Sequence, residues 1–158
     1  MGSNKEVRTI ITFKSQSFNT SESRPYFINP CCFVDDLCHF LIGKFKEAGL
    51  ECDEKPGQED FGWYFNFKYN SQTFCLIAAF RPEEEESSSP DSGLWNLYLE
   101  RAAGFIASMF GGRNKGIDEA ITQKLHSILG ATNELSELRW HFRKDFDAGK
   151  EELGTPQP

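Results

Sequence analysis

Two adjacent carboxylates, Glu59 and Asp60, stand at the start of a stretch rich in aromatic rings. Paired carboxylates can act as general acid and general base when their surroundings separate their pKa values. Neighbouring side chains on a strand point to opposite faces, so the two are poorly placed to share one substrate. A polar turn whose carboxylate accepts backbone hydrogen bonds is the structural alternative. We therefore keep Glu59 and Asp60 as candidate catalytic residues without assigning them a reaction.

A second set of candidates lies near the C-terminal end, where Arg139, His141 and Arg143 alternate with Trp140. On a strand these three side chains would form a basic row opposite the tryptophan, and such a row can hold a carboxylate or a phosphate. His141 would also be a candidate catalytic base beside the two carboxylates. The alternative is the solvent-exposed face of an edge strand that is protected by its charge.

The stretch from Glu59 to Phe80 predicts a β-hairpin, because large rings alternate with small or polar residues at the period of two that a strand requires. A two-residue loop at Asn70 and Ser71 would place every large ring on one buried face. Trp63 would then face the core and Tyr64 the opposite side, and both are kept as candidate binding residues. The predicted pairs are Phe67 with Phe74, Phe65 with Leu76, Trp63 with Ala78 and Phe61 with Phe80.

Other segments surround this hairpin with strands and two helices. Apolar residues spaced by three and four predict helices over about 30–48 and 117–129. Alternating segments predict strands over about 7–13, 50–54, 94–101 and 138–142. The expected fold is α+β: an antiparallel sheet of about five to six strands, with two main helices packed on one face.

Composition limits the predictions of domain number, partners and location. A chain of 158 residues is the usual size of one domain. Residues 81–92, with four consecutive glutamates, three serines and two prolines, predict a mobile acidic loop, and the polar residues 147–158 predict a loose tail. The net charge of −7 argues against nucleic acid or an anionic membrane as partner. With neither a secretory signal nor a membrane-spanning segment, we expect a cytoplasmic protein.

The cysteines predict neither disulfides nor a metal site. Five cysteines without framework spacing are typical of a reducing compartment. Cys31, Cys32, Cys38 and His39 are potential zinc ligands, but structural zinc sites favour spaced pairs from two chain segments. We expect no cofactor and no metal.

The pattern FINPCCFVDDLCHFLIGKFKEAGLECDEKPGQEDFGWYF, followed by a strand that begins with tryptophan and by LRWHF, covers most of residues 27–142. It resembles a family of small uncharacterised bacterial domains with a DDL…L…GL…P…EDWGW signature. Phe61 stands where that signature has tryptophan. The resemblance implies a bacterial cytoplasmic protein without an assigned activity. Small acidic α+β domains of this kind are also similar in architecture and charge to immunity proteins that neutralise toxins.

Three functions follow as hypotheses. The favoured one is a non-enzymatic interaction module whose acidic surface steers it to a basic protein partner. The second is a small-ligand-binding domain that uses the sheet face, with Tyr64, Trp95 or Trp140 at its mouth. The third is a hydrolase-like enzyme that uses Glu59, Asp60 and His141. The sequence does not define an oligomeric state.

Overall fold

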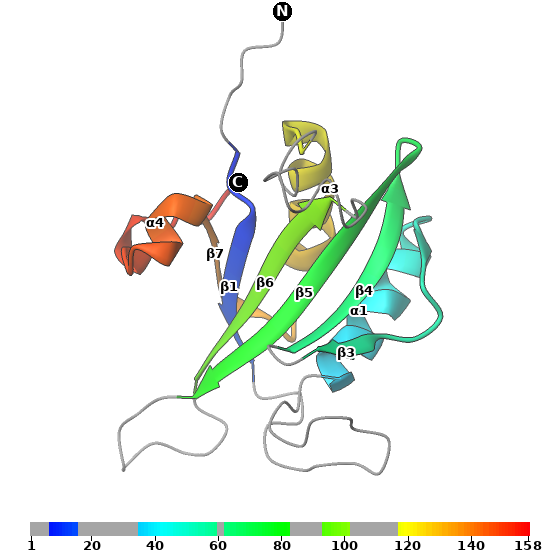
Figure 1. The fold of residues 1–158 in the computed structure, drawn as a ribbon, viewed down its shortest axis with the longest axis horizontal. Coiled ribbons are helices and arrows are strands. Elements are labelled where there is room, and N and C mark those ends of the chain that lie inside the picture. Colours follow the sequence, from blue (N-terminus) through cyan, green and yellow to red (C-terminus); the bar gives the residue numbers. More distant parts are fainter. Residues whose placement is uncertain (1–6, 16–34, 60–61, 83–92, 102–116) are drawn as a thin grey trace, which may run out of the picture.

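The structure, a computed structural model, describes residues 7–15, 35–59, 62–82, 93–101 and 117–158. Within these ranges the chain forms an α+β fold built on one sheet (Figure 1). The strands are β1 (Ile10–Lys14), β2 (Glu51–Cys52), β3 (Gly57–Glu59), β4 (Gly62–Tyr69), β5 (Gln72–Pro82), β6 (Gly93–Arg101) and β7 (Ser136–His141). The helices are α1 (Asp35–Glu47), α3 (Glu119–Gly130), α4 (Arg143–Asp147) and the 3-10 helix η2 (Glu151–Leu153).

The sheet is antiparallel throughout its described pairings, as predicted, and has the order β2-β4-β5-β6-β1-β7, with β3 also pairing with β4. The described residues form seven strands, whereas the sequence predicted five to six. The difference includes β3, which is short and has no alternating pattern, since a glycine and two polar residues follow Pro56. Backbone pairing with β4 makes it a strand.

The hairpin of β4 and β5 has the predicted register. Asn70 and Ser71 have positive φ angles of 50° and 64°, which is the conformation that a two-residue hairpin loop requires. Three of the four predicted pairs are confirmed; the fourth includes Phe61, which lies outside the described residues. The confirmed pairs are Phe67 with Phe74, Phe65 with Leu76 and Trp63 with Ala78.

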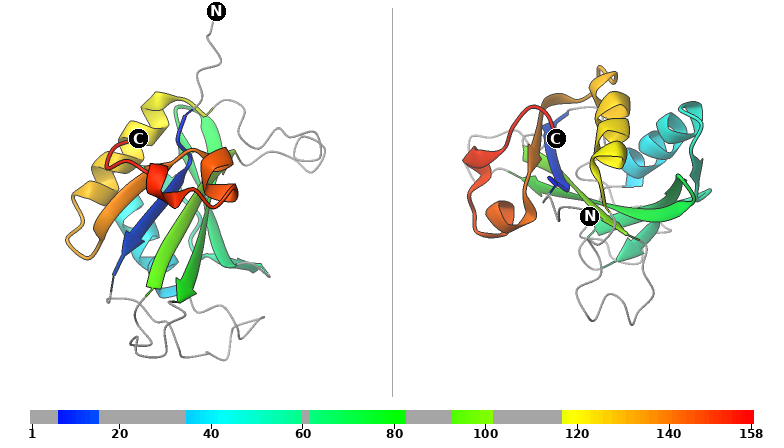
Figure 2. Two further views of the ribbon diagram at one scale, coloured as in Figure 1. Left: turned by 90° about the vertical axis from the view of Figure 1, so that its left-hand side faces the viewer. Right: turned by 90° about the horizontal axis from the view of Figure 1, so that it is seen from above.

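The main hydrophobic core lies between the sheet and two helices. In Figure 2, α1 and α3 lie on the same side of the sheet. The ring of Phe45 in α1 meets those of Phe65 and Phe67 edge-on, with centroids 5.3 and 5.0 Å away. Leu125 of α3 and Trp95 of β6 belong to the same buried cluster. We call this helix-covered side of the sheet the inner face, and the opposite side the outer face.

The C-terminal part of the chain adds a short helix to the two predicted main helices, and residues 147–158, predicted to form a loose tail, include the 3-10 helix η2. A third helix, α4, lies beside β7 on the outer face (Figure 2). Phe146 of α4 packs edge-on against Tyr98 and His141, at 6.0 and 5.4 Å between ring centroids. Beyond it, Thr155 pairs with Trp140 through two backbone hydrogen bonds. Contacts between residues distant in sequence therefore order this polar segment.

Two further observations concern predicted segments. The first two residues of the predicted acidic loop, Arg81 and Pro82, belong to β5, and residues 83–92 lie outside the described ranges. Among the described helices, each is too short or too polar to cross a bilayer.

Candidate functional site

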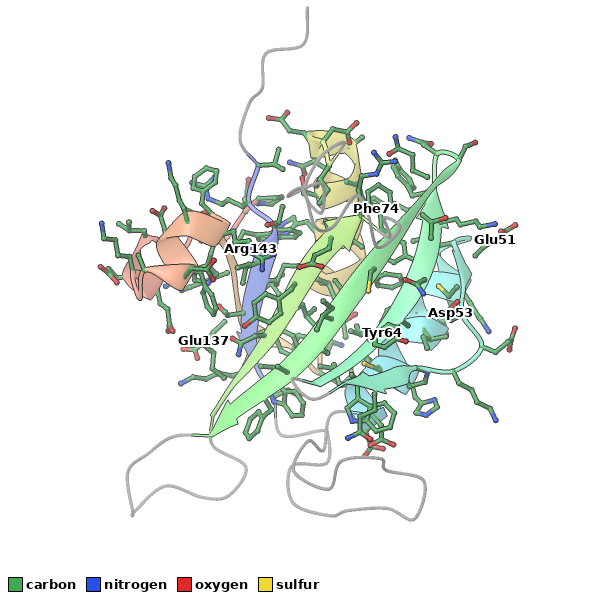
Figure 3. All side chains as sticks on the ribbon, in the orientation of Figure 1. Glu51, Asp53, Tyr64, Phe74, Glu137 and Arg143 are labelled. Carbon is green, nitrogen blue, oxygen red and sulfur yellow. The ribbon has the colours of Figure 1, made fainter. Side chains whose placement is uncertain are left out.

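A continuous row of side chains crosses the outer face. Strand register places its members directly opposite one another on five neighbouring strands. Because cross-strand partners point to the same face, they form one line across the sheet. Figure 3 labels Tyr64 at one end of this face and Arg143 of α4 near the other. We call this line the outer row: Tyr64, Ile77, Tyr98, Ile10 and His141.

The β1–β7 end of the outer row is covered, and His141 is enclosed there. The His141 side chain is 3% exposed, and its Nε2 lies 2.8 Å from Oγ1 of Thr12. Gly154 lies directly on the imidazole ring, because a Cβ atom added at Gly154 would overlap it. Phe146 of α4 packs edge-on against the same imidazole ring. We call this region, formed by β1, β7, α4 and η2, the covered end.

The structure places all three residues of the predicted basic row on the outer face, where the chain's own groups engage them. Arg143 donates from Nη1 to Oε1 of Glu100 at 2.8 Å, and Arg139 donates from Nη1 to the carbonyl oxygen of Gly154 at 3.3 Å. Hydrogen bonding to Glu100 raises the pKa of Arg143. The row therefore stabilises the covered end, and both guanidinium groups already donate hydrogen bonds within the chain.

His141 has a lowered pKa, mainly because burial disfavours the charged imidazolium. Arg139 and Arg8 act in the same direction, and Glu151 acts against them. The ring is therefore neutral at pH 7. As a catalytic base it would need access to a proton on a substrate, and Gly154 and Phe146 close that path.

Glu59 and His141 do not form a common site. Glu59 is on β3, His141 is on β7, and the strands between them are β4, β5, β6 and β1. Five strand spacings separate them by roughly 24 Å. Asp60 lies outside the described residues. The structure thus does not bring together the groups that the hydrolase hypothesis needs.

The β4–β5 end of the outer row has no described helix over it, and we call it the open end (Figure 1). Tyr64 and Ile77 are half-buried there. The ring of Tyr64 lies over the backbone of Gly57, since a Cβ atom added at Gly57 would be 2.8 Å from the Tyr64 hydroxyl oxygen. Trp63, the other predicted binding residue, is 4% exposed on the inner face and is a core residue.

Sequence reasoning overlooked Ile77, which with Cys75 and Ala79 makes three successive outward positions of β5 apolar. The signal was present in the sequence, because β5 reads as a nearly unbroken apolar run instead of alternating with polar residues. The hairpin analysis used only the inward ring positions and gave no role to the outward ones.

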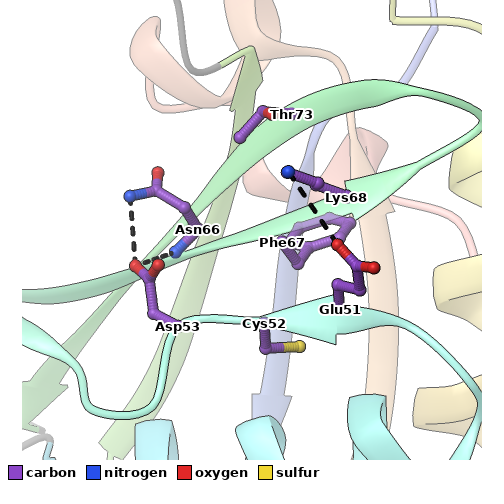
Figure 4. A pocket seen from close by; sticks show the side chains of 7 residues that line it. All are labelled: Glu51, Cys52, Asp53, Asn66, Phe67, Lys68 and Thr73. Atoms are coloured by element: carbon purple, nitrogen blue, oxygen red, sulfur yellow. Dashed lines mark hydrogen bonds and ion pairs between the residues drawn. The ribbon is translucent and has the colours of Figure 1, made fainter.

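A separate open pocket of about 220 Å³ lies where β2 meets β4 and β5 (Figure 4). Its polar groups are already paired within the chain. Both the backbone amide and the side-chain amide of Asn66 donate to Oδ2 of Asp53, at 2.9 and 3.1 Å. Lys68 lies 3.8 Å from Oε2 of Glu51. Ligand pockets for drug-sized molecules are typically about 300–1,000 Å³, so this one is small.

Two of the described cysteines, Cys38 and Cys52, are poor nucleophiles and poor metal ligands. Cys38 is fully buried in α1, and burial raises the pKa of its thiol strongly. Burial also raises the pKa of Cys52, to about 11. His39 is exposed, while Cys31 and Cys32 lie outside the described ranges. In the described part of the chain, histidine, cysteine and carboxylate side chains do not gather into a group able to hold a metal ion.

The comparisons with known proteins gave no relatives. No protein-family model matches the chain, and searches of curated proteins and of solved structures returned no match.

Proposed function

We propose that this chain is a non-enzymatic protein-interaction module that docks a partner on the open end of the outer face. The observation that carries the proposal is a small apolar group at the open end, where Ile77 of β5 lies between Tyr64 and Tyr98 with Cys75 and Ala79 on either side along the strand. An antiparallel sheet with one solvated face normally has polar residues at the outward positions. Polar residues border this group, since Asn66 and Glu100 lie opposite Cys75 and Asn96 lies opposite Ala79. Apolar side chains rimmed by polar ones are typical of an interaction surface.

We propose a basic protein as the partner. The chain has 24 acidic against 17 basic residues, and this excess would steer a cationic surface toward it. The resemblance to small bacterial domains and to immunity proteins suggests a toxin domain in the bacterial cytoplasm as the target. The same charge disfavours nucleic acid and anionic membranes as partners.

The two other hypotheses have weaker support. A hydrolase that uses Glu59 and His141 would have to act across most of the sheet. A small-ligand domain would have to use either the 220 Å³ pocket, whose charged groups are paired, or the open end itself. An open sheet surface with half-buried apolar side chains and a polar border suits a protein partner better than an enclosed small molecule.

Two single variants, each of which adds one lysine, test the proposal. Ile77→Lys places a cation on the open end, whereas Gln123→Lys adds the same charge at an exposed position of α3. Proteins captured from the native cell would be identified and then purified, and their binding would be measured by surface plasmon resonance at low and high salt. We expect a basic protein whose association slows as salt rises, and whose binding is lost with Ile77→Lys and retained with Gln123→Lys.

Equal binding by the two variants would place the partner elsewhere and overturn the proposed surface. As a control, circular dichroism of Ile77→Lys should show an intact sheet. A hydrolase activity abolished by Glu59→Gln or His141→Gln in a folded chain would instead establish the enzyme hypothesis.

A further inference from the structure

The segment that covers His141 is attached by few contacts. Hydrogen bonds to backbone groups attach it to β7 and α4: Trp140 N to Thr155 O at 2.6 Å, Thr155 N to Trp140 O at 2.9 Å, Arg139 Nη1 to Gly154 O at 3.3 Å, and Lys150 N to Asp145 O of α4 at 2.8 Å. Leu153, its large apolar side chain, is 50% exposed and so contributes little buried area. Segments with few buried apolar contacts open at low free-energy cost. We call residues 150–155 the strap.

The hydrogen bonding of His141, the residue beneath the strap, depends on whether its imidazole is protonated. A neutral imidazole has one donor and one acceptor nitrogen, and in His141 one nitrogen already meets Thr12. Nδ1 of His141 is buried and has no hydrogen-bond partner within the described part of the chain. Protonation makes both nitrogens donors, so the added N–H would be a buried charged donor without an acceptor.

The charged groups around the ring act in both directions, and the strongest of them, Glu151 of the strap, opposes the effect of burial. Arg139 on β7 and Arg8 before β1 disfavour the imidazolium, and Glu151 on η2 favours it. Glu100 of β6 and Arg143 of α4 form an ion pair with each other, which Asp147 of α4 extends. β7 is held to β1 by backbone pairing, so His141 stays in place when the strap moves. Movement of Gly154 away from the ring would therefore expose the imidazole to water.

We propose that the strap is an acid-released cover: it is held while His141 is neutral and detaches when the ring takes up a proton. Detachment would uncover the outer row at its β7 end and free the backbone groups of Trp140 on the sheet edge. Such an edge can accept an extended segment of another chain. This proposal does not depend on the proposed function.

The direction of the pH dependence follows from linkage. The pKa of His141 is lower with the strap closed than the ordinary value of 6.5 that the released ring would have. The open state therefore binds more protons at acid pH, and the strap is fully held above both values. As pH falls below about 6.5, the opening constant rises by up to about tenfold per pH unit, until the lowered pKa is passed.

Amide hydrogen exchange followed by NMR tests this in the intact chain. We expect the protection factors of Trp140 and Thr155, corrected for intrinsic exchange, to fall between about pH 7.5 and pH 5, by up to about tenfold for each pH unit below about 6.5. The amide of Leu76, in the middle of the sheet, should keep its protection. His141→Gln should abolish the fall, and the control His39→Gln, at an exposed position of α1, should preserve it.

A second readout does not need a His141 variant. Gly154→Ala introduces a methyl group that overlaps the ring, at a φ of −64° that alanine adopts readily, so it should lift the strap. The pKa of His141, followed by its imidazole proton shifts, should then rise toward 6.5. Protection of Trp140 that is independent of pH, or an unchanged His141 pKa in folded Gly154→Ala, would overturn the proposal.

Discussion

The two ends of the outer face differ in whether other parts of the chain cover them. At the covered end the row terminates in Ile10 and His141, which are both buried, and Gly154 and Phe146 lie against the His141 ring. At the open end Ile77 and Tyr64 belong to the same row but have no described helix above them. The comparison shows that the row ends in an enclosed imidazole on one side, whereas on the other side Ile77 and Tyr64 are half-buried beside polar Asn66 and Lys68. We infer that the chain covers one end of the row with its own residues and leaves the other end for a partner.

The covered end is also imperfectly satisfied. Two buried atoms there, Arg8 Nε just before β1 and His141 Nδ1 on β7, have no hydrogen-bond partner within the described part of the chain. Asn96 Oδ1, on the neighbouring strand β6, is a third such atom. An unmet buried polar atom costs roughly 1–3 kcal/mol, so this end is expected to be less stable than the core on the inner face.

The largest predicted effect separates the inner face from the open end. Trp63→Ala removes a 4% exposed ring from the core and should cost about 3–5 kcal/mol in the free energy of unfolding. Ile77→Ala, at the open end of the outer row, should cost less than about 1 kcal/mol because its side chain is only half-buried. Chemical denaturation measures both. A loss for Ile77→Ala as large as that for Trp63→Ala would mean that the open end is covered.

A smaller effect is expected within the covered end. Arg143→Ala leaves the 9% exposed side chain of Glu100 without its 2.8 Å partner and should cost about 1–2 kcal/mol, a value lowered because Arg143 is itself 35% exposed. Arg139→Ala, which removes one bond to the strap, should cost less than about 1 kcal/mol. If the two variants had equal stability in urea unfolding, the Glu100 pair would not hold α4 in place.

The smallest perturbation is covalent labelling of cysteines, which probes the two faces without a mutation. Cys75 is half-buried at the open end, whereas Cys38 is fully buried on the inner face with a strongly raised pKa. Because the thiolate is the reacting species, a maleimide should modify Cys75 well before Cys38 at neutral pH. Peptide mapping by mass spectrometry gives both rates. Comparable rates would contradict the assignment of the two faces.

The sequence was sufficient for the local elements and for the hairpin register. Ring alternation and the loop at Asn70 and Ser71 fix which residues pair, because a shift by one residue would expose every ring. The two long helices were predicted from their apolar spacing. These patterns involve residues close together in the chain.

The covered end was not predictable in the same way, because its contacts join distant residues. Thr12 and His141 are 129 positions apart, and Glu100 and Arg143 are 43 apart. The composition of the tail is polar, so no local pattern announced that Gly154 would lie on His141. Strand order decided this outcome: β7 pairs with β1, and only that pairing places His141 beside Thr12.

Hydroxyl-radical footprinting of Ile10 and Ile77 tests the central claim most directly. The two residues have the same side chain and belong to the same row, but Ile10 is 1% exposed under the covered end and Ile77 lies at the open end. In the isolated chain at neutral pH, mass spectrometry should find Ile77 oxidised several-fold faster than Ile10. Gly154→Ala should raise the oxidation of Ile10 and leave that of Ile77 unchanged. Equal protection of the two isoleucines in the absence of any partner would contradict the account.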